Sequence, residues 1–266
     1  MSSRPVRTSS LSAFACIFLV VALSALLPGG PAEPAPGGHP PSARTSAAAD
    51  TSAATISSLW AKPLPRATDY VAKGIDCGPT GSDGDTITNL RKNRTDIPGE
   101  YHAVNVRAIT DLKFPIAPRS RARWTQAQLA EIEPFEGVAV TMTGYLEDLR
   151  VEGAERTNCG MTDSADVDWH LWVTQLPQEP KSGAIVVETT PRIRRSHPHW
   201  TPASLQPWVR SNRSVRISGW LMLDPDHPDQ VGLTRSTIWE IHPITKIEVR
   251  DAPGLWTDLD SLRLSG

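Results

Sequence analysis

Five runs of apolar and polar residues between 135 and 250 resemble β-strands, and the first of them, 137–150, alternates apolar and polar positions over its length. These runs predict strands at 137–150, 168–176, 184–193, 214–224 and 237–250. A helix is predicted between the third and fourth strands, at about 201–210. Thr201 is a good N-cap there, and Pro202 suits the first helical position. Pro243 predicts a bulge or an edge within the last strand.

Five strands with one helix between the third and fourth follow the element order of the OB-fold, a Greek-key barrel. We therefore predict a mainly β protein with an OB-fold-like five-stranded barrel at 135–250 and a tail at 251–266. A jelly-roll fragment is the competing architecture, and the lone helix argues against it.

A short irregular extension is predicted ahead of the barrel, over residues 59–134. Within it, alternation predicts a strand at 102–109, and the cap residue Thr125 predicts a short helix at 125–132. The stretch 90–96 is polar and turn-like.

The first residues resemble an export address. Residues 1–30 combine Arg4 and Arg7 with the apolar run 12–27, as in a secretory signal peptide or an uncleaved anchor. Residues 31–58 are so rich in Pro, Ala, Gly, Ser and Thr that they predict a disordered tether. We expect an exported protein that is secreted, periplasmic or tethered to the cell surface, and that meets a membrane only through this segment.

The cysteine content fits that compartment. Removal of the signal would leave Cys77 and Cys159, and two cysteines in an oxidising compartment most simply form one disulfide. That disulfide would join the extension to the first long loop of the barrel.

Charge and composition add little about a partner. A formal net charge of −2 predicts no basic surface on the scale of a DNA-binding protein. The chain has nine Trp residues, a residue type that plugs small barrels and also lines binding faces.

The alternation also predicts a polar cluster. Asp168 and His170 share one face of their strand, Glu188 lies on the next strand, and Glu240 shares a face with His242. Two imidazoles with carboxylates can ligate a divalent metal such as zinc or iron, or serve in acid–base chemistry. The core of this alternative is His170, Glu188 and His242. The other interpretation is a hydrogen-bonded layer that seals the barrel mouth.

A second candidate site is the basic stretch between the third strand and the helix. It combines cations with aromatic rings, as a single-stranded nucleic-acid site requires. The predicted ligand-binding residues are Arg192, Arg194, Arg195, His197, His199, Trp200, Trp172 and Trp220. A solvated loop is the competing interpretation of this stretch.

Familiar enzyme signatures are missing from the sequence. It has no phosphate-binding loop, dinucleotide fingerprint, nucleophile elbow or Cys-x-x-Cys pair. The tetrad Asp83-Gly84-Asp85-Thr86 is similar to one in staphylococcal-type nucleases, but it precedes the barrel and lacks the strand that should follow.

The motifs DWHLW, VVETTPRIR and TIWEIHP resemble a set of uncharacterised exported bacterial OB-fold-like proteins. The resemblance covers residues 135–250 and implies no activity. We expect a binding module for an unknown ligand, either single-stranded nucleic acid, an oligosaccharide or an envelope protein. The alternative is a metal-dependent hydrolase with a His/carboxylate site at the barrel mouth.

Overall fold

The computed structural model describes residues 62–82, 84–252 and 254–262, so the predicted signal and tether lie outside the described residues. The strands are β1 (Tyr70–Ala72), β2 (Ile75–Cys77), β3 (His102–Asn105), β4 (Ala139–Val151), β5 (Trp169–Thr174), β6 (Ile185–Thr189), β7 (Ser214–Leu223), β8 (Trp239–Ala252) and β9 (Leu255–Asp258). The α-helices are α1 (Thr86–Lys92), α2 (Val106–Thr110), α3 (Gln126–Ile132), α4 (Pro191–Arg194) and α5 (Pro202–Leu205).

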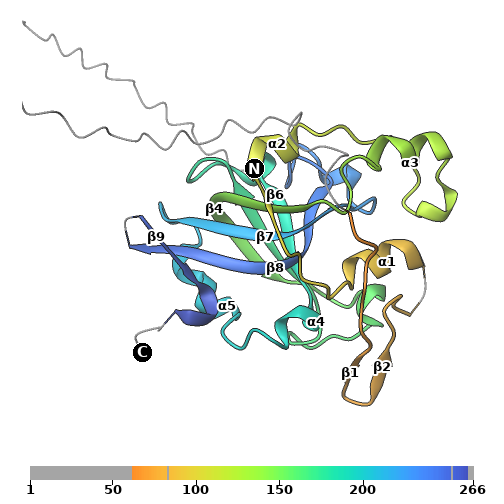
Figure 1. The fold of residues 1–266 in the computed structure, drawn as a ribbon, viewed down its shortest axis with the longest axis horizontal. Helices are drawn as coiled ribbons and strands as arrows, with labels where there is room; N and C mark the ends of the chain where they lie inside the picture. The colour runs from red at the N-terminus through yellow and green to blue at the C-terminus, as the bar shows by residue number, and fades with distance from the viewer. Residues whose placement is uncertain (1–61, 83, 253, 263–266) are drawn as a thin grey trace, which may run out of the picture. The chain divides into compact units, whose positions relative to one another are not determined.

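Five strands close into a mixed β-barrel (Figure 1). The pairing runs β4–β5–β6–β8–β7 and returns from β7 to β4. All of these pairs are antiparallel except β6–β8, which is parallel. Two further strands extend the sheet, β3 beside β4 and β9 beside β8. The five predicted strands and the closed barrel are therefore confirmed.

The connection between the third and fourth barrel strands differs from the prediction. The strand predicted at 184–193 ends at Thr189, because the Thr190 side chain caps α4 and Pro191 opens it. The helix predicted at 201–210 is α5 followed by the 3₁₀ helix η5 (Gln206–Trp208). The irregularity predicted at Pro243 is confirmed, because the β7–β8 register shifts there, opposite Gly219.

The segment before the barrel is more ordered than predicted. The stretch 90–96 was expected to be turn-like, and that expectation is wrong for its first part, which completes α1. Asp85 caps this helix by accepting from the backbone N–H groups of Ile87 and Thr88. The buried face of α1 is polar, formed by Thr88, Asn89 and Lys92, so no apolar periodicity marked the helix.

Two other predictions in this segment have mixed outcomes. The strand predicted at 102–109 is strand only to Asn105, whose side chain caps α2 by accepting from Ala108 N–H at 2.7 Å. The helix predicted at 125–132 is confirmed as α3, with a capping box between Thr125 and Gln128.

The two faces of the barrel strands have different coverings. Leu171, Val187 and Ile241 belong to the main apolar core, so their neighbours in sequence point to the opposite face. Helix α1 packs on β8.

The predicted Cys77–Cys159 disulfide is confirmed. It joins β2 to the turn after the 3₁₀ helix η3 (Arg156–Asn158). A disulfide is typical of an oxidising, extracytoplasmic compartment. Within the described part of the chain, every helix is too short or too polar to cross a membrane.

Candidate metal centre

Three neighbouring strands bring the predicted polar residues together. His170 on β5 lies directly opposite Glu188 on β6. In the parallel β6–β8 pair, Val187 lies opposite Ile241, so the next residue on each strand, Glu188 and His242, are also neighbours.

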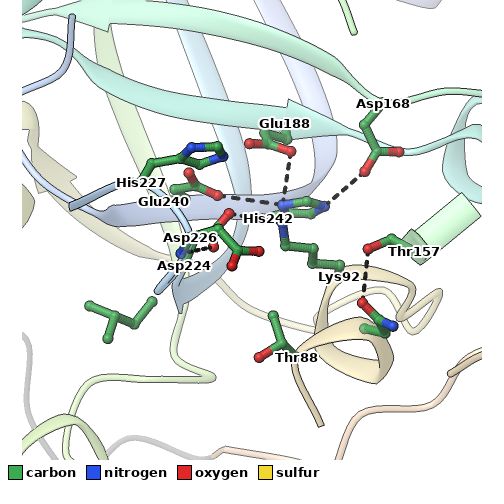
Figure 2. Close-up of polar contacts among 12 residues, drawn as sticks. Thr88, Lys92, Thr157, Asp168, Glu188, Asp224, Asp226, His227, Glu240 and His242 are labelled. Carbon is green, nitrogen blue, oxygen red and sulfur yellow. Dashed lines mark hydrogen bonds and ion pairs between the residues drawn. The ribbon is translucent and has the colours of Figure 1, made fainter. Parts of the chain in front are cut away.

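His242 lies at the centre of the cluster (Figure 2). Its Nε2 is 3.5 Å from Asp168 Oδ2, and its Nδ1 is 3.2 Å from Glu188 Oε2 and 3.5 Å from Glu240 Oε2. All four side chains are at most 1% exposed. The structure therefore places an imidazole and three carboxylates in contact, away from bulk solvent.

The cluster does not lie at the barrel mouth, where we expected it. It lies on the outer face of the sheet, opposite the apolar core, because His170, Glu188 and His242 alternate with core residues. The covering elements are α1, which supplies Lys92, and the turn after β4, where Asn158 donates to Asp168 Oδ1 at 3.0 Å.

Three cationic groups neutralise part of the negative charge. Lys92 Nζ lies 2.8 Å from Asp224 Oδ2, and Arg235 NH1 lies 2.5 Å from Glu240 Oε1. His170 lies between two carboxylates, with Nε2 2.8 Å from Glu188 Oε1 and Nδ1 3.2 Å from Glu152 Oε1.

Several buried donor and acceptor atoms nevertheless lack a hydrogen bond of good geometry. They are Asp168 Oδ2, both carboxylate oxygens of Glu188, Glu240 Oε2 and both ring nitrogens of His242. Glu188 Oε1 still lies 2.8 Å from His170 Nε2, and His242 lies within 3.5 Å of three carboxylates, so these atoms do have ion-pair contacts. Buried polar atoms are normally satisfied, so an orphaned set of this size needs an explanation.

Two groups of side chains in this cluster could hold a metal ion. One ligand atom from each of Asp168, Glu188 and His242 lies within 4.8 Å of the other two, and the same holds for Glu188, Asp224 and Glu240. In the second group, Lys92 and Arg235 already neutralise Asp224 and Glu240. The first group is the better candidate, and its mixed nitrogen and oxygen donors suit zinc, iron(II) or manganese(II).

The pKa values show how strongly the cluster favours positive charge. Burial alone would lower the pKa of both histidines, but the surrounding carboxylates, chiefly Glu188, outweigh it. The pKa of His170 rises to about 9 and that of His242 to about 10. The pKa of Glu188 stays well below its ordinary value because the attraction of both imidazoles outweighs its burial. A proton on His242 and a metal ion therefore compete for the same place.

A polar cavity of about 660 Å³ adjoins the cluster on the α1 side. Lys92 and Glu155 are in its wall, and Lys92 links it to the cluster through Asp224. Burial and the negative charge of Asp168 raise the pKa of Glu155 to about 8. The cavity thus places a group that can exchange protons near neutral pH beside the candidate metal ligands.

The basic stretch predicted to bind a ligand is folded into the protein. The Arg192 guanidinium donates to Asn93 Oδ1 and to the carbonyls of Thr68, Cys77 and Gly78. Arg194 donates to the carbonyls of Thr189, Ala165 and Val167. Both arginines are buried, so they bind the chain itself.

The aromatic residues of that prediction are also buried. Trp172, Trp200 and Trp220 are each at most 4% exposed. Trp220 stacks under the Arg94 guanidinium at 3.5 Å, and Trp200 stacks on His197, whose Nδ1 contacts Asp260 Oδ2 at 2.5 Å. Arg195, over the Tyr70 ring, and His199 are exposed, but the structure does not combine them with the three tryptophans into one surface.

Sequence reasoning missed four charged members of the site and its cavity: Lys92, Glu155, Asp224 and Arg235. Lys92 and Asp224 lie in stretches that resembled turns, and their pairing spans 132 residues. No local pattern marked either one.

Searches of protein-family models, curated proteins and solved structures find no match to this chain. The resemblance to exported bacterial proteins therefore stays a prediction, and the site must be interpreted from its own chemistry.

Proposed function

We propose that this protein is an exported OB-like barrel module that binds one divalent metal ion, such as zinc, through Asp168, Glu188 and His242. The strand pairing β4–β5–β6–β8–β7, with its parallel β6–β8 pair, supports an OB-like barrel. In OB-folds the second and third strands carry the ligand-binding face, and here that face holds the cluster.

The observation that carries the proposal is the set of buried atoms without hydrogen bonds. Each unsatisfied buried polar atom costs about 1–3 kcal/mol, and Asp168, Glu188 and His242 together contribute five of them. A cation between the three side chains would bind one ring nitrogen of His242 and one oxygen each of Asp168 and Glu188, and the second ring nitrogen could then donate to a neighbouring carboxylate. Glu240 and His170 would then orient the ligands from the surrounding shell.

The direct test is metal analysis of protein purified without a histidine tag and incubated with zinc, manganese or iron(II). We expect about one equivalent of one metal in the wild type and about a hundredfold weaker binding in His242→Gln and Glu188→Gln. His197→Gln, which changes a histidine outside the cluster, is the matched control. A wild type that retains none of the three metals would disprove the proposal.

A metal-dependent hydrolase is the second candidate, favoured by the position of Glu155 in the wall of the adjoining cavity. A bound metal ion would supply an activated water, and Glu155 could exchange a proton with a ligand in the cavity. The buried tryptophans and arginines, by contrast, give little support to single-stranded nucleic acid or oligosaccharide binding. No exposed stacking surface forms from the residues predicted to bind such ligands.

A further inference from the structure

The cavity beside the cluster is built from segments that are far apart in the sequence. Helix α1, the turn at 155–157 and the loop between β7 and β8 surround it, together with Arg119 and Ser120. Figure 2 shows Thr88 and Lys92 of α1 and Thr157 below His242, with Asp226 of the loop to its left. Its volume of about 660 Å³ lies within the range of small-molecule sites.

Lys92 has hydrogen-bonding capacity to spare. Its side chain is 7% exposed and makes one hydrogen bond among the described residues, to Asp224 Oδ2 at 2.8 Å. An ammonium group has three donors, so two remain in a wall of the cavity. Unused donors on a buried cation favour a ligand that brings acceptor oxygens.

The other charges of the cavity also favour an anion. Arg119 and Arg156 add two cations to its lining. The Asp85 carboxylate is already occupied, since it accepts from the start of α1 and from Arg121 N–H. A neutral Glu155 would add a donor, which leaves Asp85 and Asp226 as the lining carboxylates whose negative charge opposes an anion.

We propose that this cavity binds a small organic anion, a carboxylate or a phosphate ester, whose oxygens accept hydrogen bonds from Lys92 and are attracted by Arg119. The proposal stands apart from the metal ion, because none of the three candidate metal ligands lines the cavity. Lys92 connects the two sites through Asp224, so the ligand would bind one residue away from the metal cluster.

The test is isothermal titration of the metal-free protein with inorganic phosphate and with succinate, at constant ionic strength. We expect saturable binding of at least one probe, and the preferred probe identifies the phosphate or the carboxylate class. Arg119→Gln should weaken binding about fivefold, because Arg119 is an exposed charge that also contacts Asp229 Oδ1 at 3.4 Å. Arg107→Gln, which changes an exposed arginine on α2 away from the cavity, should leave binding unchanged.

Lys92→Met alone would leave Asp224 buried without its partner, so the protein could fail to fold. The double variant Lys92→Met/Asp224→Asn removes both charges, and it should fold but lose at least tenfold in affinity. The proposal is overturned if neither probe saturates, or if the double variant and Arg119→Gln both bind like the wild type. Metal content is measured separately, so failure of this proposal is distinct from failure of the metal site.

Discussion

The segment around α4 and the cluster under α1 both concentrate cations and histidines, but their hydrogen bonding differs. At α4, the guanidinium groups of Arg192 and Arg194 bind backbone carbonyls and one amide, and neither is left with an orphaned buried nitrogen. In the cluster, His242 and Glu188 are also buried, but they meet their neighbours in ion-pair contacts without a hydrogen bond of good geometry. The comparison teaches that residue type alone does not tell whether buried charged groups are satisfied by the chain, whereas the bonding of each buried atom does.

The largest expected loss of stability concerns the Cys77–Cys159 disulfide beside the α4 segment. There Arg192 donates hydrogen bonds to the carbonyls of Cys77 and Gly78. The disulfide joins residues 82 apart, and a loop of that length contributes roughly 4 kcal/mol to stability. Cys77→Ser/Cys159→Ser should therefore lose about that free energy in urea unfolding. Metal stoichiometry should stay at the wild-type value, because the proposed ligands lie on or beside barrel strands. Loss of metal from a folded double variant would show that the disulfide region and the metal cluster are not independent.

A smaller effect is expected at Arg194. Arg194→Met removes the guanidinium that lies over the Trp169 ring and leaves the carbonyls of Thr189, Ala165 and Val167 without their donor. We expect the free energy of unfolding to fall by about 3 kcal/mol, since unsatisfied buried acceptors are costly.

The control for Arg194 is its exposed neighbour. Arg195→Met should cost under about 1 kcal/mol, because exposed charges contribute little. Equal losses in the two variants would show that the buried carbonyl contacts of Arg194 carry no special weight.

The residues of the cluster could be predicted from the sequence, but the role of the arginines around α4 could not. The strand pattern repeats every two residues and is local, so the faces of His170, Glu188 and His242 could be predicted, and their convergence followed from barrel closure. A run of arginines, however, looks the same whether it is solvated or bonded to carbonyls. Only tertiary packing decided that Arg192 and Arg194 are buried.

The same limit applies to the covering of the site. The polar buried face of α1 gives no apolar periodicity, and Lys92 meets Asp224 only after the chain has closed the barrel. The barrel mouth was a natural prediction for polar residues on strands. It failed because the outer face is covered by α1 and the turn after β4, which no local pattern indicated.

The smallest expected effect is a change in the pH dependence of stability at Glu155, which lies in the cavity wall beside the cluster. Its pKa of about 8 in the folded protein is above the ordinary value, chiefly because of burial and then Asp168. A carboxyl with a raised pKa binds more protons when folded than when unfolded between about pH 4.5 and 8, so stability falls as pH rises through that range. Glu155→Gln removes this dependence.

Relative to the wild type, the variant should gain stability between pH 5.5 and 8.5. The gain should be only about 1 kcal/mol, because solvent in the cavity screens part of the effect. Urea unfolding at both pH values measures the gain, with Glu179→Gln as the matched control. A difference that does not change with pH would mean that neither burial nor the charge of Asp168 raises the pKa of Glu155.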